Sequence, residues 1–412
     1  MKVLFFYQHF WPDSPPYANM LRSIGDGLSN RGMDVSIVTA QPSYKSLDRQ
    51  TVCPAQENLG NVLIHRLSML PGARRFEVLR KLTKILFPVR AALWLIFRRL
   101  KGEAPDVIVA ATIPPVINGF FGLLASRLVG ARFVYHMLDI YPEIGVSGGL
   151  WSRNSLRYRV LNMLDSWITR HADLCVVLSK DMQLSLNVRS GDIKGVEIIS
   201  NLILNDHDNS ISNPINSSVV GPSESETVNS PRKLVFAGNI GRFQALDKVV
   251  EAFIGLDHQT LGLELHFVGE GAALKELKNN ASVCPYIFFH PHRSIRDTEK
   301  FISKCHAGIV SLQPTAYHYA WPSKTLAYIS IGMPIFLVME SSSSLALELL
   351  DADIGEVSGG HDIESIKSSM TRLAKRLSEG QFTQERIQGY CSNNYDNERT
   401  LDRWYNTINQ LN

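Results

Sequence analysis

Residues 234–241 read Leu-Val-Phe-Ala-Gly-Asn-Ile-Gly, an apolar run that ends in a glycine-containing turn. A helical stretch follows from Leu246. A buried strand, a tight turn and a helix in this order are typical of a parallel α/β sheet. The backbone N–H groups of such a turn can approach a phosphate. A Gly-x-x-Gly segment is equally typical of an ordinary tight turn, so both interpretations stay open here.

The same alternation of strand and helix extends in both directions from this segment. Short runs rich in Val, Ile and Phe predict strands at residues 3–7, 35–39, 62–67, 107–111, 133–138, 174–178, 196–199, 234–237, 263–268, 287–290, 308–312 and 334–338. Near-continuous apolar strands that alternate with helices indicate parallel sheets covered on both faces.

One break divides the pattern, and 412 residues are too many for one ordinary core. Residues 205–232 are rich in Ser, Asn and Pro and poor in large apolar residues, which predicts a flexible linker. We therefore expect a first domain at residues 1–204 and a second at 233–384. The helical stretch 385–412 is predicted to pack back on the first domain.

Composition narrows the class of protein. With 45% hydrophobic and 20% charged residues, the chain is typical of soluble globular proteins. No apolar stretch reaches the ~18 residues of a membrane-spanning helix, and the N-terminal run is expected to be a strand rather than a signal peptide. A net charge of +3 does not point to nucleic acid. Five widely spaced cysteines indicate reduced thiols in a cytoplasmic protein.

A candidate phosphate site lies at Pro322-Ser323-Lys324-Thr325, after the predicted strand 308–312. If the next helix begins here, its N–H groups, a hydroxyl and an ammonium would surround one anion. The alternative is a capped surface helix with a solvated lysine. The place beyond the carboxyl end of a strand favours binding.

Two acidic residues, Asp139 and Glu143, end a predicted strand of the first domain. A hydroxyl group is a weak nucleophile, and a carboxylate can orient it or accept its proton. The alternative is that Asp139 caps a helix and Glu143 is solvated. His136 is expected to face away from Asp139, into the core.

Residues 74–101 combine nine Lys and Arg with a single acid, Glu77, and many large apolar residues. This pattern predicts an interfacial membrane-binding segment. The alternative is a pair of core helices with basic outer faces. Two segments resemble metal-binding motifs. Residues 351–353 read Asp-Ala-Asp but follow a predicted helix rather than a strand, and residues 290–292 read His-Pro-His but have no third ligand nearby. We therefore expect no metal.

Seven motifs follow one another along the chain. They are Tyr7-Gln8-His9-Phe10-Trp11-Pro12, Leu138-Asp139-Ile140-Tyr141-Pro142-Glu143, Val177-Leu178-Ser179, Ile199-Ser200-Asn201, Phe236-Ala237-Gly238-Asn239, Phe267-Val268-Gly269-Glu270-Gly271 and Pro322-Ser323-Lys324. Taken in order, they resemble those of family 4 glycosyltransferases, which are retaining enzymes, and most closely those of bacterial O-antigen, capsule or exopolysaccharide synthesis. The resemblance covers nearly the whole chain. It implies the GT-B fold, two Rossmann-like domains that face each other across a cleft.

The resemblance also implies an activity. A hexosyl group would pass from a nucleotide-sugar to a lipid-linked saccharide, at the cytoplasmic face of the cell membrane, with the segment 74–101 on the membrane surface. No metal, other cofactor or nucleic acid is implied. The catalytic residues would be Asp139 and Glu143. Donor contacts would fall on Gly238, Asn239, Arg242, Gln244, Arg293, Ser323, Lys324 and Thr325.

The sequence departs from the family pattern near the donor site. Tyr319 and Ala327 stand where many members carry two glutamates, the second of which binds ribose, and Asn239 and Gln244 stand where an Arg and a Lys commonly hold the diphosphate. Lys324 is therefore expected to carry more of the phosphate binding. Two alternatives stay open, a nucleotide-sugar epimerase of the same fold and a non-catalytic assembly partner. A dinucleotide-dependent dehydrogenase is disfavoured, because no GxGxxG follows either first strand.

Overall fold

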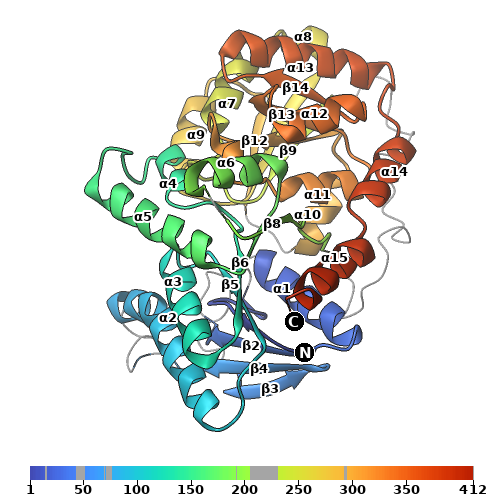
Figure 1. Cartoon of the computed structure of the whole chain (residues 1–412). Helices are drawn as coiled ribbons and strands as arrows, with labels where there is room; N and C mark the ends of the chain where they lie inside the picture. The colour runs from blue at the N-terminus through green and yellow to red at the C-terminus, as the bar shows by residue number, and fades with distance from the viewer. Residues whose placement is uncertain are drawn as a thin grey trace. The chain divides into compact units, whose positions relative to one another are not determined.

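The computed structural model describes residues 1–13, 16–42, 52–68, 70, 77–191, 193–204, 231–291 and 295–411. It forms two compact α/β units (Figure 1). The first unit contains Met1–Val146, Trp151–Leu204 and Asn397–Asn412. The second contains Ser147–Leu150 and, of the described residues, 231–396. Among the described helices, none is both long and apolar enough to cross a bilayer.

The first unit is built on an eight-stranded sheet in the order β3-β4-β2-β1-β5-β6-β7-β8. The strands are β1 (Lys2–Phe6), β2 (Asp34–Ala40), β3 (Gln56–Leu59), β4 (Val62–Leu67), β5 (Val107–Ala111), β6 (Arg132–His136), β7 (Leu174–Val177) and β8 (Val196–Ile198). Only the edge pair β3–β4 is antiparallel. The parallel sheet confirms the predicted fold class for this half of the chain.

Helices cover both faces of this sheet. One face carries α2 (Glu77–Leu100), α3 (Ile117–Val129) and α5 (Leu156–His171), where Phe6 packs against Phe87 of α2 with ring centres 5.8 Å apart. The Tyr135 hydroxyl donates to Asp165 of α5 at 2.8 Å. The part of the basic segment from residue 77 onward forms one long helix that contains Pro88, not a pair of helices.

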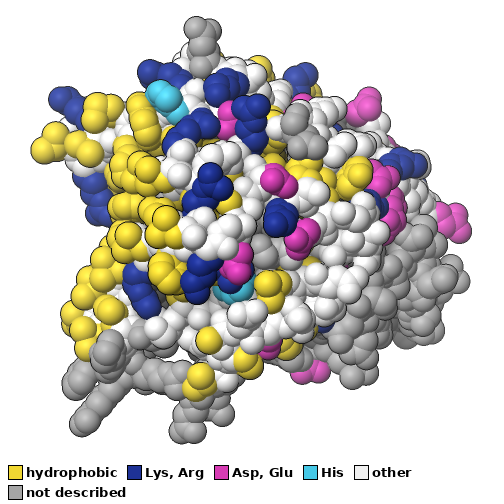
Figure 2. Space-filling model, turned by 60° about the horizontal axis from the view of Figure 1, so that its bottom comes forward, with side chains coloured by type: hydrophobic (Ala, Val, Ile, Leu, Met, Phe, Trp, Pro, Cys, Tyr) yellow, Lys and Arg dark blue, Asp and Glu magenta, His cyan; other side chains and the backbone are white. Residues whose placement is uncertain are grey.

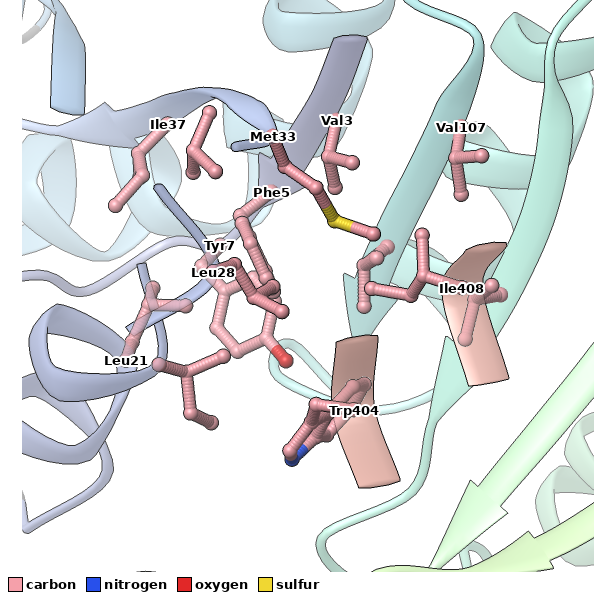
Figure 3. Packing of buried hydrophobic residues seen from close by; sticks show 14 of the residues in the cluster. Val3, Phe5, Tyr7, Leu21, Leu28, Met33, Ile37, Val107, Trp404 and Ile408 are labelled. Carbon is pink, nitrogen blue, oxygen red and sulfur yellow. The ribbon is translucent and has the colours of Figure 1, made fainter. Parts of the chain in front are cut away.

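The opposite face is closed by α1 (Pro16–Asn30) and the C-terminal helix α15 (Asn397–Asn409). Trp404 and Ile408 of α15 lie in the same buried cluster as Tyr7 (Figure 3). The Tyr7 hydroxyl is hydrogen-bonded to His136 Nδ1 at 2.5 Å, and the centres of the His136 and Trp404 rings lie 4.9 Å apart. Burial lowers the pKa of His136 to about 3, so the ring is neutral. His136 is a core residue, as the strand alternation predicts.

The C-terminal stretch 385–412 is divided between the units. Helix α14 (Gln384–Asn394) belongs to the second unit, where Ile387 and Cys391 are buried and the hydroxyl of nearby Tyr395 donates to Glu348 at 2.8 Å. Only residues from Asn397 onward belong to the first unit. The predicted linker at 205–232 lies outside the described residues, except for Pro231 and Arg232, and Arg232 already begins a strand.

The second unit is a six-stranded parallel sheet in the order β11-β10-β9-β12-β13-β14. The strands are β9 (Arg232–Ala237), β10 (Leu263–Val268), β11 (Ile287–His290), β12 (Ala307–Ser311), β13 (Ile335–Glu340) and β14 (Gly355–Gly359). Its core contains residues of α7 (Leu246–Ile254), α9 (Leu274–Ala281) and α13 (Ile363–Ser378). Helices α10 (Ile295–Ile302), α11 (Lys324–Ser330) and α12 (Ser344–Asp351) belong to the same unit. Both units are thus Rossmann-like.

Candidate functional site

The strand order of the second unit reverses at β9, which has β10 on one side and β12 on the other. Strands β9 and β12 pair at only two positions, so they separate toward their carboxyl ends. Open α/β sheets bind ligands at such a point. The loops that follow the two strands meet here, because the Gln313 N–H donates to the Phe243 carbonyl at 2.7 Å and its amide donates to the Arg242 carbonyl at 3.0 Å.

Tyr328 of α11 fills the space between the separating strands. Its hydroxyl accepts from the Ala237 N–H at 2.9 Å and donates to the Val235 carbonyl at 3.3 Å. Its ring lies so close to Gly308 of β12 that a β-carbon there would come within 2.4 Å of ring atoms. These contacts fix α11 against the end of β9, with its first residue, Lys324, beside Gly238.

Lys324 lies over the carboxyl end of β9. Its Nζ is 4.6 Å from the ring centre of Phe236, and a β-carbon at Gly238 would come within 2.7 Å of Lys324 Cε. Burial lowers the pKa of Lys324 from 10.5 to about 8. Among the described residues, no carboxylate pairs with its ammonium. A half-buried ammonium without a counter-ion is suited to an anionic ligand, which would replace the water it has lost.

The glycine turn after β9 is held by the loop after β10. The N–H groups of Gly238 and Ile240 donate to the carbonyls of Val268 and Glu270, each at 2.8 Å. The Gly241 N–H donates to the side chain of Gln244 at 3.0 Å. These N–H groups already have partners, so the interpretation as a structural turn is favoured over a phosphate cradle. Gln244 therefore supports the turn.

The other predicted donor residues differ in their surroundings. Asn239, Arg242 and Ser323 are exposed, and the Ser323 side chain makes no capping hydrogen bond to α11, so the predicted cap is absent. Thr325 is buried, and its hydroxyl has no hydrogen-bond partner within the described parts of the chain. Arg293 lies outside the described residues. The structure thus places Gly238, Ser323 and Lys324 at one strand end.

A small pocket of about 200 Å³ opens beside the same turn. Its lining includes Arg242 and Gln313 but also Asp247 and Glu276. Ligand pockets usually measure about 300–1,000 Å³, and two carboxylates would repel a phosphate. We therefore place the candidate anion site at Lys324 and not in this pocket.

In the first unit the strand order reverses between β1 and β5. The side-chain amide of Asn118 joins the two strand ends, donating to the Phe6 carbonyl at 3.0 Å and to the Ala111 carbonyl at 2.8 Å. The loop after β1 holds a buried pair in which His9 Nδ1 lies 2.7 Å from Asp13 Oδ2. Sequence reasoning missed this pair. The signal was the spacing of four between a histidine and an aspartate just beyond the first strand.

Asp139 follows β6 and is half-buried. Burial raises the pKa of its carboxyl from 3.8 to about 6. No hydrogen bond or ion pair from a described residue reaches this carboxylate. Burial and, second, the charge of Asp139 raise the pKa of the Tyr141 hydroxyl. A carboxyl group that titrates near neutral pH and is not neutralised is suited to accept a proton.

Glu143 has a different environment, and the interpretation as a solvated residue is wrong. Its side chain is buried, Asn162 donates to one carboxylate oxygen at 2.8 Å, and Arg189 donates to the other at 3.0 Å. Arg189 also donates to buried Asp165 at 2.5 Å and to the Tyr141 carbonyl at 2.9 Å. Glu143 therefore belongs to a buried ion-pair network that holds the segment beside Asp139.

The two segments that resemble metal-binding motifs interact with other protein side chains. Asp353 pairs with Arg376 and Arg386 at the end of α12. His290 lies 3.0 Å from His266, and the second histidine of its motif lies outside the described residues. No group of three metal-ligating side chains occurs within the ranges that the structure describes.

Two Rossmann-like units with loops gathered at the carboxyl ends of parallel strands define the class of the fold, which is GT-B. Residues 17–201 match the family model described as a glycosyl transferase 4-like domain. The chain is also 24% identical over 257 residues to the "Probable glycosyltransferase WbjE" of Pseudomonas aeruginosa. That match covers 61% of this chain and 61% of WbjE, less than two thirds of either.

Solved structures match over the whole chain. Sucrose-phosphate synthase from Thermosynechococcus elongatus superimposes with a TM-score of 0.75 at 12% identity, covering 100% of this chain and 99% of that one. HepE of Anabaena, solved in complex with UDP, gives 0.67 at 13% identity and covers 100% of both chains. WaaG, a glycosyltransferase involved in lipopolysaccharide biosynthesis, gives 0.62 at 14% identity and covers 99% of both chains. At such identities the likeness shows the fold alone.

Proposed function

We propose that this protein is a retaining glycosyltransferase that moves a hexosyl group from a nucleotide-sugar to a saccharide acceptor. The observation that carries the proposal is the uncompensated ammonium of Lys324 at the switch point of the second sheet. The match of residues 17–201 to a glycosyl transferase 4-like model supports it. So do the printed name of WbjE and the UDP bound by HepE.

In this proposal the donor diphosphate binds at Lys324. When the glycosidic bond to the nucleoside diphosphate breaks, negative charge grows on the leaving phosphate oxygens. A fixed ammonium stabilises that charge more in the transition state than in the ground state. The exposed hydroxyl of Ser323 and the exposed guanidinium of Arg242 are further donors in the same unit. We assign no metal to this step, because the residues present supply cationic charge themselves.

Asp139 is assigned to the acceptor. Its carboxylate would orient a sugar hydroxyl and accept its proton, which the pKa of about 6 permits at neutral pH. The Arg189 network fixes the backbone at Tyr141, two residues away, and so limits the movement of Asp139. We further propose that the acceptor is a lipid-linked saccharide for a cell-surface polysaccharide such as O-antigen. The protein would then be cytoplasmic and peripheral to the inner membrane face, with residues 74–101 on the membrane.

The test is incubation with a panel of nucleotide-sugars and polyprenyl-diphosphate-linked saccharides, with product analysis by mass spectrometry and NMR of the new anomeric centre. We expect transfer with retention by the wild type and loss of donor binding in Lys324→Ala. Conversion of the donor without an acceptor would instead identify an epimerase. The absence of transfer, donor hydrolysis and donor binding would overturn the proposal and favour a non-catalytic role.

A further inference from the structure

Helix α2 is apolar on two opposite faces. One face, with Phe87, Ala91 and Leu95, is buried in the first unit. The other carries large apolar side chains at helical spacing that are exposed. These are Val78, Leu82, Ile85, Leu93, Phe97 and Leu100. A surface helix normally has one apolar stripe, against its own core. The second stripe therefore lacks a cover within the described residues.

Helices α3 and α5 carry exposed apolar stripes of the same kind. On α3 they are Leu124 and Leu128, and on α5 they are Leu156, Val160, Met163 and Trp167. Helices α3 and α5 meet at the ring of Phe120 and that of Trp167, which lie 5.9 Å apart. Helix α3 packs against both α2 and α5, so the three helices form one layer. Figure 2 shows a band of hydrophobic side chains along the side where Figure 1 places these helices. Contiguous apolar patches of this extent mark interaction sites.

Cations outnumber acids on these three helices, although Arg98 pairs with Glu103 and Arg127 with Asp173 beyond the helix ends. By sequence, α2, α3 and α5 carry ten Lys and Arg and two acids, Glu77 and Asp165. Asp165 is fully buried and paired with Arg189, so the described side chains of these helices expose no carboxylate. At the end of α2, cations lie over aromatic rings, with Lys101 Nζ 4.8 Å from the Phe97 ring centre. Basic residues that border large apolar and aromatic ones suit the headgroup region of a bilayer.

We propose that α2, α3 and α5 together form one membrane-docking surface, whose apolar stripes enter the boundary between headgroups and acyl chains of an anionic bilayer. The positive charge of this surface favours a bilayer over a second copy of the chain as its partner. A second copy docked by this same face would bring like charges together, whereas anionic lipid headgroups neutralise them. The inference rests on the proposed membrane location and deepens it, since it adds α3 and α5 to the segment 74–101.

The test measures co-sedimentation of the full chain with vesicles. One set is pure phosphatidylcholine, and the other is equal parts phosphatidylcholine and phosphatidylglycerol. We expect the wild type to bind the anionic vesicles and to dissociate as salt is added. Met163→Glu on α5 and Leu124→Glu on α3 should each weaken partitioning about tenfold or more, since burial of one such side chain is worth at least that factor. Met163→Leu should retain binding. Leu347→Glu, at a helical position on α12 of the second unit whose exposure lies between those of Leu124 and Met163, is the matched control and should change nothing.

Three results would overturn the inference. One is no binding to anionic vesicles. Another is full binding by both Met163→Glu and Leu124→Glu, which would confine the contact to α2. The third is a solution dimer that Met163→Glu dissociates, which would make the surface a protein interface. Circular dichroism and the binding of a nucleoside diphosphate are measured for each variant to establish that it is folded. Failure of the wild type to bind nucleoside diphosphates would refute the proposed function without affecting the conclusion from vesicle binding.

Discussion

Replacing Lys324 with Met should stabilise the protein when no ligand is present. The fall in the pKa of Lys324 from 10.5 to about 8 means that its charged form is disfavoured in the folded state. That fall corresponds to about 3 kcal/mol at neutral pH. The contact with the Phe236 ring, 4.6 Å from Nζ, is lost on substitution and offsets up to about 1 kcal/mol. Met keeps the unbranched stem, so we expect a net gain of about 2 kcal/mol in the free energy of unfolding.

The pH dependence of this gain has a definite sign. Because the folded-state pKa of Lys324 is lowered, its destabilising effect is complete below about pH 8. It fades as the pH rises toward 10.5, where the lysine of the unfolded chain also loses its proton. Differential scanning calorimetry of the second unit's transition should show a rise of about 4–8 °C near pH 7. The difference between variant and wild type should shrink at high pH.

Ligand binding should offset the stability advantage of the variant. A nucleoside diphosphate at about 100 times its Kd stabilises a native protein by about 2.7 kcal/mol, and Lys324→Met should lose most of this effect. The matched control is Lys278→Met, because Lys278 also lies over an aromatic ring, 5.6 Å from Phe289, but is exposed. It should change stability by less than about 0.5 kcal/mol. A less stable Lys324→Met, or one that nucleotide still stabilises fully, would refute the reasoning.

The other predictions concern both units. The affinity for a nucleoside diphosphate, measured by isothermal titration calorimetry, should fall as the pH rises through about 8, because Lys324 loses its charge there. The variant Lys324→Arg should remove this pH dependence. Asp139→Asn should lower kcat by about 10²–10⁴-fold with donor affinity unchanged, and wild-type initial rates should fall below about pH 6, where this carboxyl is protonated. Arg189→Leu should cost about 3–5 kcal/mol in urea unfolding, since it leaves two buried carboxylates unpaired. Trp404→Ala should cost about 3–5 kcal/mol in the calorimetric transition of the first unit only, because its ring is fully buried there.

Most strands could be predicted because a parallel strand covered on both faces is a near-continuous apolar run. The two strands that were missed lack this signal. Strand β3 reads Gln-Glu-Asn-Leu and lies at an antiparallel edge. Strand β14 reads Gly-Glu-Val-Ser-Gly and closes the other sheet with small and polar residues. The assignment of the C-terminal helices to different units could not be predicted from the sequence either. Periodicity shows that α14 and α15 each have a buried face, but it does not show against which of the two cores that face packs.

The candidate site was predicted unevenly, for a physical reason. Lys324 could be placed beyond β12, the strand that precedes its motif, but its contact with Gly238 at the end of β9 could not be predicted, because β9 lies far away along the chain. Glu143 could not be interpreted, because the partner that neutralises it, Arg189, lies 46 residues away along the chain. A carboxylate after a strand has the same sequence signature whether it is solvated, catalytic or paired. The glycine turn after β9 posed the same difficulty, since its N–H groups bond to a loop that starts more than one element later.

The two sites share a property that the sequence does not show. Each unit holds, beyond the carboxyl end of a central strand, one charge that burial has made costly and that no described residue neutralises. The charge is a carboxylate at Asp139 in the first unit and an ammonium at Lys324 in the second. A protein under selection for stability alone would pair or remove such charges. Their signs match what sugar transfer requires, a base for the attacking hydroxyl and a cation for the departing diphosphate. If the proposed function holds, each unit should be less stable empty than occupied, and each substrate should stabilise the unit that binds it.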